Sequence, residues 1–326
     1  MVIGIYSVIL ILNLRCEIVM FVRASIGTLA KLGLADIKII DEPRTAYFLQ
    51  YSENGCLGKC RFCNQSRSSR AGKDWLGKVT WPPVELATVL DSWRDVFDRV
   101  CFQTIIKQGF IEEARVFIRE ITRVSDLPVS LAITPVSKSI LREFKELGVD
   151  KLGVGLDTVT EELFTKWGKP YTWRIYWRFI EEAVDVFGEG NVYVHIIVGL
   201  GESLREALET IIKIYSKGAR VALFNYFDSS NMKSIDKRYY RIIQLAVELI
   251  ENGEDPLEYI DLDSMRFKQQ PGIDVYEALY TRGCPGCNRP FYTDLPRVIY
   301  NFPSRKILEK HRNEIMRELE SIGVKA

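Results

Sequence analysis

The sequence has no excess of charge of either sign, and this absence limits its partners. Its 44 Lys and Arg residues nearly cancel its 43 Asp and Glu residues, which leaves a formal net charge of +1. Such a chain lacks the positive field that holds proteins on nucleic acid or on anionic membranes by counterion release. We therefore expect no nucleic acid and no membrane among its partners, and small molecules or proteins instead.

A hydrophobic run long enough to span a bilayer is also missing. Residues 1–14 are uncharged and apolar, but a membrane helix needs about 20 such residues. The segment also lacks the basic start and the small-residue cleavage site of a signal peptide. Two interpretations stay open: a buried strand, or an upstream extension of a protein that starts at Met20, which would make Cys16 artefactual.

Cysteine is present in an odd number, seven residues, and its distribution is uneven. Six of the cysteines form two close groups and one isolated position, at Cys56, Cys60, Cys63, Cys101, Cys284 and Cys287. Close groups with an odd total favour metal ligation over a disulfide framework. We therefore expect a reducing compartment and a cytoplasmic location.

The middle of the chain alternates amphipathic helical stretches with short β-branched runs, which is typical of βα units around a parallel sheet. Helices are expected at 84–98, 137–147, 160–186, 204–216 and 237–251, with a break near Gly168 and Pro170 in the third. A further helix has Ala114, Phe117, Ile118 and Ile121 on one face, and strands are expected at 99–105, 129–133, 151–156, 192–198 and 220–226.

This pattern predicts an α/β fold, a partial TIM-type (βα) barrel with parallel strands, whose chemistry lies at the carboxyl ends of the strands. We divide the chain into an N-terminal extension (1–45), the partial barrel (46–254) and an irregular C-terminal cap (255–326) that carries Cys284 and Cys287. A helical face in the tail, formed by Leu308, Ile315, Leu319 and Ile322, is expected to pack on the barrel, with a partner protein as the alternative.

The strongest motif is a loop that follows the apolar run 46–51. It reads Cys56-Leu-Gly-Lys-Cys60-Arg-Phe62-Cys63 and places three thiols in eight residues. Three thiolates on a 4Fe-4S cluster leave one iron open, whereas a structural zinc site needs a fourth protein ligand. The motif resembles the C-x3-C-x-aromatic-C signature of the radical S-adenosylmethionine (SAM) superfamily. That resemblance implies a 4Fe-4S cluster on the three cysteines, SAM on the open iron, and Phe62 beside the adenine.

Two later stretches support this resemblance. Lys151-Leu-Gly-Val-Gly-Leu-Asp157-Thr and Ile196-Ile-Val-Gly199-Leu-Gly201-Glu202 each end an expected strand. They resemble stretches that line the SAM pocket of biotin synthases and their relatives. The resemblance implies that Asp157 is the ribose-binding acid and that Gly199, Gly201 and Glu202 approach the nucleoside. One departure is Gly155, because the related enzymes carry Asn there. We predict no role for His195, since a strand histidine is more often a core residue.

The remaining cysteines predict a second site. Cys101 lies in an expected strand, and Cys284-Pro-Gly-Cys287 lies in the cap. We predict that the three share an auxiliary iron-sulfur cluster, of the 4Fe-4S type. The alternatives are a small buried side chain for Cys101 and a zinc knuckle for the CPGC pair. Candidates for the fourth ligand are Cys16, Arg266 and a substrate or solvent group.

The narrowest resemblance lies in the cap. Gly283-Cys-Pro-Gly-Cys-Asn-Arg-Pro-Phe-Tyr292 and Ile299-Tyr-Asn-Phe-Pro303 resemble the archaeal two-component lipoyl synthases. This implies sulfur insertion into an octanoyl chain, after SAM cleavage to methionine and a 5′-deoxyadenosyl radical that removes a hydrogen atom from the chain. It also implies an octanoylated lipoyl carrier protein, a sister radical SAM subunit and an electron donor such as ferredoxin as partners. Biotin synthesis, another radical SAM sulfurtransferase activity, and a non-enzymatic metal-bearing scaffold are the alternatives.

Overall fold

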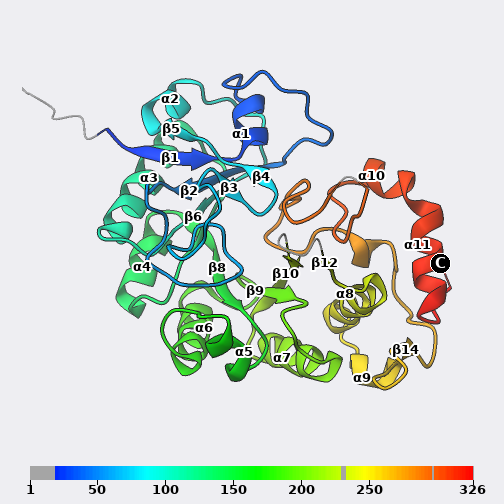
Figure 1. The fold of residues 1–326 in the computed structure, drawn as a ribbon. Coiled ribbons are helices and arrows are strands. Elements are labelled where there is room, and N and C mark those ends of the chain that lie inside the picture. Colours follow the sequence, from blue (N-terminus) through cyan, green and yellow to red (C-terminus); the bar gives the residue numbers. More distant parts are fainter. Residues whose placement is uncertain (1–18, 229–232, 296, 326) are drawn as a thin grey trace, which may run out of the picture.

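The computed structural model describes residues 19–228, 233–295 and 297–325, which build an α/β fold around one mixed sheet (Figure 1). The strand order is β10-β9-β8-β7-β6-β2-β1-β5, and the run from β2 to β10 is parallel. Among the described residues the two ends of this sheet do not pair with each other. The sheet is therefore that of a partial TIM-type barrel, as predicted. The possible N-terminal strand and Cys16 lie outside the described residues.

The parallel strands and their helices follow the predicted order closely. The strands are β2 (Thr45–Gln50), β6 (Arg99–Gln103), β7 (Val129–Ala132), β8 (Val149–Asp157), β9 (Val192–Val198) and β10 (Arg220–Asn225). The helices are α3 (Phe110–Val124), α4 (Lys138–Glu146), α5 (Glu161–Lys166), α6 (Trp173–Phe187), α7 (Leu204–Ser216) and α8 (Lys237–Glu251). The predicted break in 160–186 is the gap between α5 and α6, which contains Gly168 and Pro170.

The helix predicted at 84–98 is largely wrong. Residues Pro83–Glu85 form β5, which pairs antiparallel with β1 (Phe21–Ala24), and only Leu86–Asp91 form the helix α2. Proline fixes its own φ and pushes the residue before it toward extended conformations, so the Pro82-Pro83 pair favours an edge strand here. After α2 the chain is held by hydrogen bonds to distant residues and not by helical ones. For example, Lys31 Nζ donates to the Val96 carbonyl at 2.6 Å.

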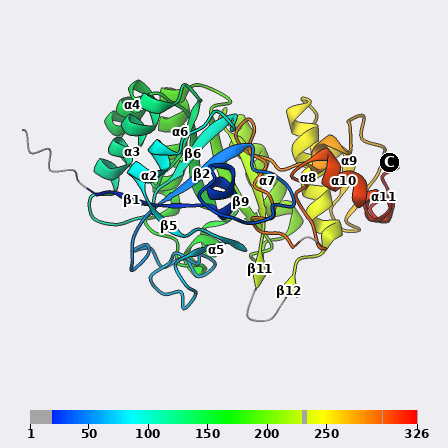
Figure 2. The ribbon, with the colours of Figure 1, turned by 90° about the horizontal axis from the view of Figure 1, so that it is seen from above.

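Alternation along the strands separates a helix-covered face from an inner face. In β2 the side chains of Ala46 and Phe48 pack in the main core, whereas Tyr47 and Leu49 pack in a second cluster on the inner face. The outer face is covered by α3, α4, α6 and α7 (Figures 1 and 2). There Phe102 stacks on Phe117 with ring centroids 4.0 Å apart. Burial of each such ring stabilises the fold by about 1.5–3 kcal/mol. This packing holds the amphipathic helices on the sheet.

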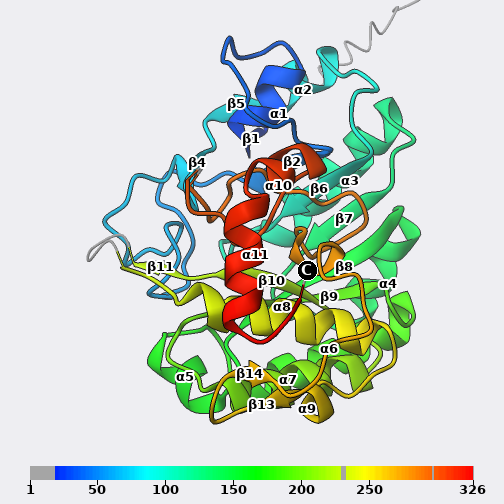
Figure 3. The ribbon, with the colours of Figure 1, turned by 90° about the vertical axis from the view of Figure 1, so that its right-hand side faces the viewer.

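The C-terminal helix α11 (Arg312–Ser321) lies beside α8, and α10 (Arg305–Lys310) precedes it (Figure 3). The predicted apolar face, Leu308, Ile315, Leu319 and Ile322, is buried at 2% exposure or less. Arg241 of α8 is fully buried and donates to Glu318 of α11 at 2.7 Å and to the Tyr300 carbonyl at 2.5 Å. These bonds fasten the tail to the barrel, because a buried guanidinium left without partners would be costly.

Within the part of the chain that the structure describes, no helix is both long and apolar enough to cross a bilayer.

Candidate active site

The inner face of the sheet encloses a cavity of about 720 Å³. Its wall includes every cysteine in the described part of the chain: Cys56, Cys60, Cys63, Cys101, Cys284 and Cys287. None of these six forms a disulfide. Its rim includes the exposed apolar side chains of Ile37, Ile40 and Trp75. Sequence positions more than 200 residues apart therefore contribute thiols to one interior space.

The loop of Cys56, Cys60 and Cys63 follows β2 and is shaped by backbone bonds. Cys56 N–H donates to the Gln65 carbonyl at 2.6 Å, which closes the loop on itself. Gly55 has a φ of +73°, and a Cβ at this position would lie only 2.5 Å from the Gln65 carbonyl oxygen. Glycine is therefore required at the entrance of the loop.

The sulfur of Cys56 already has hydrogen-bond donors. The N–H groups of Gly58 and Ile106 donate to Cys56 Sγ at 3.2 and 3.3 Å. A Cβ on Gly58 would lie 3.3 Å from Cys56 Sγ and 4.0 Å from Cys60 Sγ, so the bare glycine keeps the space between these two sulfurs open. Among the described residues, no three His, Cys, Asp or Glu side chains converge on one point as ligands of a single metal ion. Three thiols in one loop, of which Cys56 already accepts two N–H groups, fit an iron-sulfur cluster.

Burial sets the protonation of these thiols. It raises the pKa of Cys60 to about 12, with Lys169 opposing and Cys63 and Cys56 adding to the rise. Burial likewise raises the pKa of Cys63 to about 11, with a further contribution from Cys56. The pKa values of Cys60 and Cys63 are thus both raised further by the neighbouring Cys56. Cluster binding would displace their protons, as metal binding to cysteine does.

Asp157 ends β8 in a strained conformation. Its φ is +67°, and the pairing of β8 with β9 shifts register between Gly155 and Asp157. Aspartate tolerates this left-handed region better than most residues, and the turn keeps its carboxylate at the cavity wall. Lys169 Nζ donates to Asp157 Oδ2 at 2.5 Å and to the Gly155 carbonyl at 2.7 Å.

Lys169 was not singled out from the sequence. Its side chain is 5% exposed, and it lines the cavity. Burial acts to lower the pKa of Lys169, but attraction to Asp157, Tyr176 and Cys60 outweighs burial and raises the pKa above its usual value. The helix break at Gly168 and Pro170 was the only sequence signal, because it places Lys169 in the turn between α5 and α6.

Phe62 lines the cavity and begins a row of aromatic rings. Its ring centroid lies 6.0 Å from that of Trp167, which lies 5.2 Å from that of Tyr226. Trp167 Nε1 donates to the Leu200 carbonyl at 2.8 Å. Aromatic faces of this kind suit a planar base, and the bond to Leu200 connects the row to the turn after β9.

The three predicted residues of that turn lie beside the cavity rather than in its wall. Gly199, Gly201 and Glu202 are not among the residues that line it. A Cβ on Gly199 would lie 3.5 Å from Tyr226 Cβ and would clash with Ile235. The Glu202 carboxylate accepts the Gly199 N–H at 2.5 Å. The turn packs against the aromatic row. A contact of these three residues with SAM stays a prediction.

The second group of thiols consists of Cys101, Cys284 and Cys287. In the parallel register Cys101 of β6 stands between Tyr47 of β2 and Ser130 of β7. Burial raises the pKa of Cys101 well above its usual value, and the neighbouring thiols of Cys284 and Cys287 raise it further. Burial also raises the pKa of Cys284 to about 12, with Cys287 adding to it. All three residues line the cavity, and Cys101 lies within electrostatic reach of both Cys284 and Cys287.

The cap turn that carries Cys284 and Cys287 is fastened to the amino ends of β2 and β6. Arg99 Nε donates to the Pro285 carbonyl at 3.1 Å, and Thr45 Oγ1 donates to the Gly286 carbonyl at 3.2 Å. Arg99 is itself held by Asp150 of β8, with bonds of 2.5 and 2.9 Å. The CPGC turn and the cysteine loop thus lie at opposite ends of the sheet, because the cysteine loop follows the carboxyl end of β2, while Cys101 lies in the middle of β6.

Several groups between the two thiol sets were missed from the sequence. Tyr47 Oη donates to Cys287 Sγ at 3.4 Å and accepts the Arg289 N–H at 2.9 Å. Tyr292 is a partly buried residue of the wall, and its pKa is raised by desolvation and by both Cys63 and Cys101. The alternation of β2 could have placed Tyr47 on the inner face, but no local pattern marks Arg289 or Tyr292.

Two expectations about single residues need correction. Arg266 does not line the cavity; it lies in β14 (Arg266–Phe267) and donates to the Ser321 carbonyl at 3.0 Å. Arg266 is therefore not a candidate ligand. His195 is not a plain core residue, since it lines the cavity and packs edge-on against Phe224. Burial lowers the pKa of His195 to about 4, which keeps the ring neutral.

This geometry agrees with the family comparison. A profile of the Radical SAM superfamily matches residues 52–214, half of the chain. The chain belongs to the radical SAM superfamily. It is a radical SAM enzyme, and membership implies a 4Fe-4S cluster and SAM. The matched segment begins just before the loop of Cys56, Cys60 and Cys63.

Comparison with solved structures gives the same fold. The FeFe-hydrogenase maturase HydG from Carboxydothermus hydrogenoformans has a TM-score of 0.50 at 14% identity, covering 84% of this chain and 66% of that one. A second HydG structure has a TM-score of 0.49 at 12% identity, covering 64% of this chain and 50% of that one. The chain thus spans about half the length of that HydG. Methylornithine synthase (PylB) has a TM-score of 0.48 at 12% identity, covering 85% of this chain and 81% of that one.

No curated protein matches the sequence.

Proposed function

We propose that this radical SAM enzyme inserts sulfur into a protein-bound octanoyl chain, as one of two cooperating subunits of lipoyl cofactor biosynthesis. One observation carries the proposal: two groups of three thiols line a single cavity, one in the loop after β2 and the other on β6 and the CPGC turn. A radical SAM site needs only the first group. The second group is suited to an auxiliary iron-sulfur cluster next to the substrate.

The roles of the residues follow from their places in the cavity. Cys56, Cys60 and Cys63 would hold the radical SAM cluster, and Cys101, Cys284 and Cys287 the auxiliary cluster. When bound, the first cluster supplies the electron that cleaves SAM and the second supplies the sulfur atom. Phe62 would flank the adenine of SAM. Asp157 would receive a polar group of its ribose, with Lys169 holding the carboxylate in place.

The space between the two thiol groups suits an alkyl chain. The inward positions of β8 include Gly153 and Gly155, which leave this part of the wall without side chains. A Cβ on Gly153 would lie 3.0 Å from both Ala132 Cβ and His195 Nε2, so a larger residue would narrow the cavity. Ile197, Ala222 and Phe224 complete an apolar lining. An octanoyl chain asks for such a lining and for few polar partners.

Gly155 also bears on the main alternative, biotin synthesis. Dethiobiotin has a ureido ring whose buried N–H and C=O groups need partners, and each one left unpaired costs about 1–3 kcal/mol. A Cβ at position 155 would lie 3.4 Å from the Asp157 carboxylate. With glycine there, the wall offers no side-chain amide at this point, which favours the octanoyl substrate.

The test offers two substrates to the anaerobically reconstituted and reduced enzyme, an octanoyl-lysyl peptide and dethiobiotin. We expect mass spectrometry to find sulfur on the octanoyl peptide alone. One sulfur atom per chain supports half of a two-enzyme pathway, and two support a self-sufficient synthase. Sulfur on dethiobiotin and none on the peptide would move the assignment to biotin synthesis. Zinc without iron in protein purified without oxygen would contradict the enzymatic proposal altogether.

A further inference from the structure

The outer side of the cysteine loop has an unusual composition. Between Asn54 and Lys73 the sequence has five basic residues and no acidic one, although the chain as a whole is nearly neutral. Four of these residues are exposed: Lys59, Arg61, Arg67 and Arg70. The concentration of positive charge is therefore local to the segment that carries Cys56, Cys60 and Cys63.

These cations have no acidic partners. In residues 19–228, 233–295 and 297–325, no carboxylate lies within ion-pair distance of Lys59, Arg61, Arg67 or Arg70. Asp74, the acidic residue directly after this segment, instead forms an ion pair with Arg23, with 2.5 Å between Asp74 Oδ1 and Arg23 Nη1. Elsewhere on the surface cations are commonly paired, as Lys217 is with Glu181 at 2.7 Å. The loop therefore presents uncompensated charge to solvent.

An apolar side chain and one further cation complete this surface. Leu57, directly after Cys56, is 51% exposed although it is a large hydrophobic residue. Lys166 ends α5 and is exposed, and the next residue, Trp167, accepts the Arg61 N–H through its carbonyl at 2.9 Å. We call Leu57, Lys59, Arg61, Arg67, Arg70 and Lys166 the basic patch. An apolar centre with charged surroundings is typical of a protein interface.

From this composition we infer that the basic patch is the docking surface of an acidic one-electron donor protein. Complementary charge speeds such encounters, and interfaces for electron transfer are small. Proximity favours a donor, since Leu57 adjoins Cys56, and Lys59 and Arg61 flank Cys60. None of the patch residues lines the cavity. An octanoylated carrier protein would instead have to reach the apolar rim at Ile37, Ile40 and Trp75, because its acyl chain must enter there.

The inference rests on the cluster proposed at Cys56, Cys60 and Cys63. In each encounter the cluster that Cys56, Cys60 and Cys63 would hold would take one electron from the reduced donor, which would become oxidised. The cluster would supply this electron to SAM, whose C5′–S bond would break to give methionine and the 5′-deoxyadenosyl radical. Repeated turnover therefore needs a donor that can dock and leave quickly, as charge-steered partners do.

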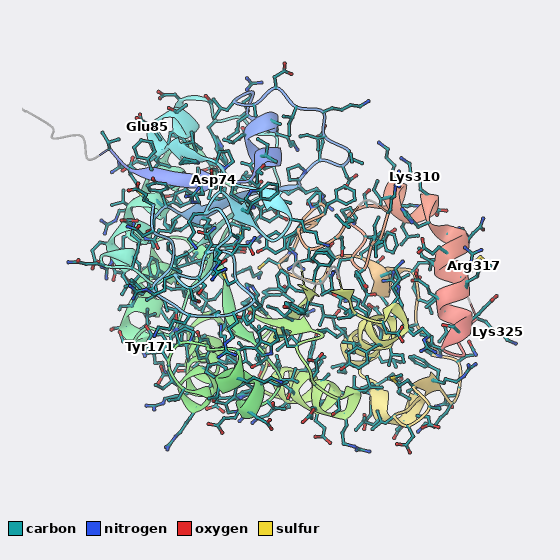
Figure 4. The ribbon with its side chains drawn as sticks, in the orientation of Figure 1. Asp74, Glu85, Tyr171, Lys310, Arg317 and Lys325 are labelled. Atoms are coloured by element: carbon teal, nitrogen blue, oxygen red, sulfur yellow. The ribbon has the colours of Figure 1, made fainter. Side chains whose placement is uncertain are left out.

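The experiment measures 5′-deoxyadenosine formation by the full-length reconstituted chain with two reductants. One is an acidic ferredoxin at limiting concentration, and the other is reduced methyl viologen, a small cation that needs no docking surface. The variant is Arg67→Glu/Arg70→Glu. The matched control is Arg317→Glu/Lys325→Glu, which makes the same charge change on α11 and at the end of the chain (Figure 4). Arg67→Gln/Arg70→Gln is a milder second variant that keeps the test valid if the reversal fails to fold.

We expect the reversal to slow the ferredoxin-driven rate about tenfold at low salt and to remove most of its salt dependence. The viologen-driven rate should stay unchanged, and the control variant should behave as wild type with both reductants. Equal ferredoxin-driven rates in wild type and both Arg67/Arg70 variants would overturn the inference. So would a reversal that slows thiolation of an acidic carrier protein with viologen as reductant. Failure of wild-type protein to cleave SAM with viologen would instead refute the proposed function, and the docking inference with it.

Discussion

Replacing Lys169 by Met should reveal how strongly the buried pair with Asp157 holds the site. The substitution removes the charge but keeps a flexible side chain of similar length. Lys169 and Asp157 are 5% and 15% exposed, and no other acidic side chain pairs with Lys169 in the described chain. Loss of one partner would therefore leave the Asp157 carboxylate without its counter-ion.

The expected magnitude follows from this burial. Breaking a buried ion pair by removing one partner costs about 3–5 kcal/mol. Because Asp157 lies in the wall of a cavity that water can enter, we take the lower end and expect a loss of about 3 kcal/mol in unfolding free energy. Affinity for SAM should also fall, by at least about tenfold, since a hydrogen bond to a charged group contributes about 1.5–3 kcal/mol.

Denaturant unfolding of the metal-free chain gives the first quantity, and equilibrium dialysis of SAM against the reconstituted enzyme gives the second. Lys138→Met is the matched control, because Lys138 pairs with Asp185 on the surface, where the side chains are 35% and 63% exposed. Such a pair contributes about 0–1 kcal/mol. The double variant Lys169→Met/Asp157→Asn should regain part of the lost stability. If Lys169→Met costs no more than Lys138→Met, the reasoning about the buried pair is refuted.

Two further predictions concern the cap. Cys284→Ala/Cys287→Ala should remove the iron of the second cluster and all product sulfur but leave reductive SAM cleavage intact; full iron content in this variant would contradict the second site. Burial raises the pKa of Asp294 from 3.8 to about 6, so the folded state binds a proton at Asp294 more tightly than the unfolded state does. The free energy of unfolding should therefore fall as pH rises from about 4 to 6. Asp294→Asn should remove that slope and raise stability at pH 7 by on the order of 2 kcal/mol, and an unchanged slope in urea titrations would contradict this origin.

The sequence predicts the barrel well because its helices are strongly amphipathic and its strands are buried. The strand Val192–Val198 and the helices Leu204–Ser216 and Lys237–Glu251 lie where the pattern predicts them. Ser203 and Glu206 form a capping box at the start of the first of these helices, which is a local signal. The helix predicted at 84–98 fails for the opposite reason. Its first residues pair with β1, which lies about 60 residues earlier in the chain. Helical periodicity does not show this pairing, although Pro82 and Pro83 are a local signal against a helix.

The residues of the site also fall into those that the sequence predicts and those that it does not. The cysteine loop could be predicted because all three thiols and the aromatic residue lie within eight positions. Lys169, Arg289 and Tyr292 could not, because each reaches the cavity through tertiary contacts. Arg289 Nη2, for example, donates to the Leu223 carbonyl at 3.1 Å and stacks its guanidinium over Phe224, 3.8 Å from the ring centroid. Glu202 shows the converse. Its motif suggests ligand contact, yet its carboxylate accepts a backbone N–H of its own turn.

Strand register connects the proposed chemistry to the fold. Cys101 faces the cavity because β6 pairs Cys101 with Tyr47 and Ser130, while Val100 and Phe102 face the helices. A shift of one residue would turn Cys101 toward the helices and place Phe102 in the cavity. The stacking of Phe102 on Phe117 opposes that shift, because it would bring the ring into contact with water. The packing of the outer core therefore decides whether Cys101 lines the cavity, and the proposed second site depends on residues that do not line it.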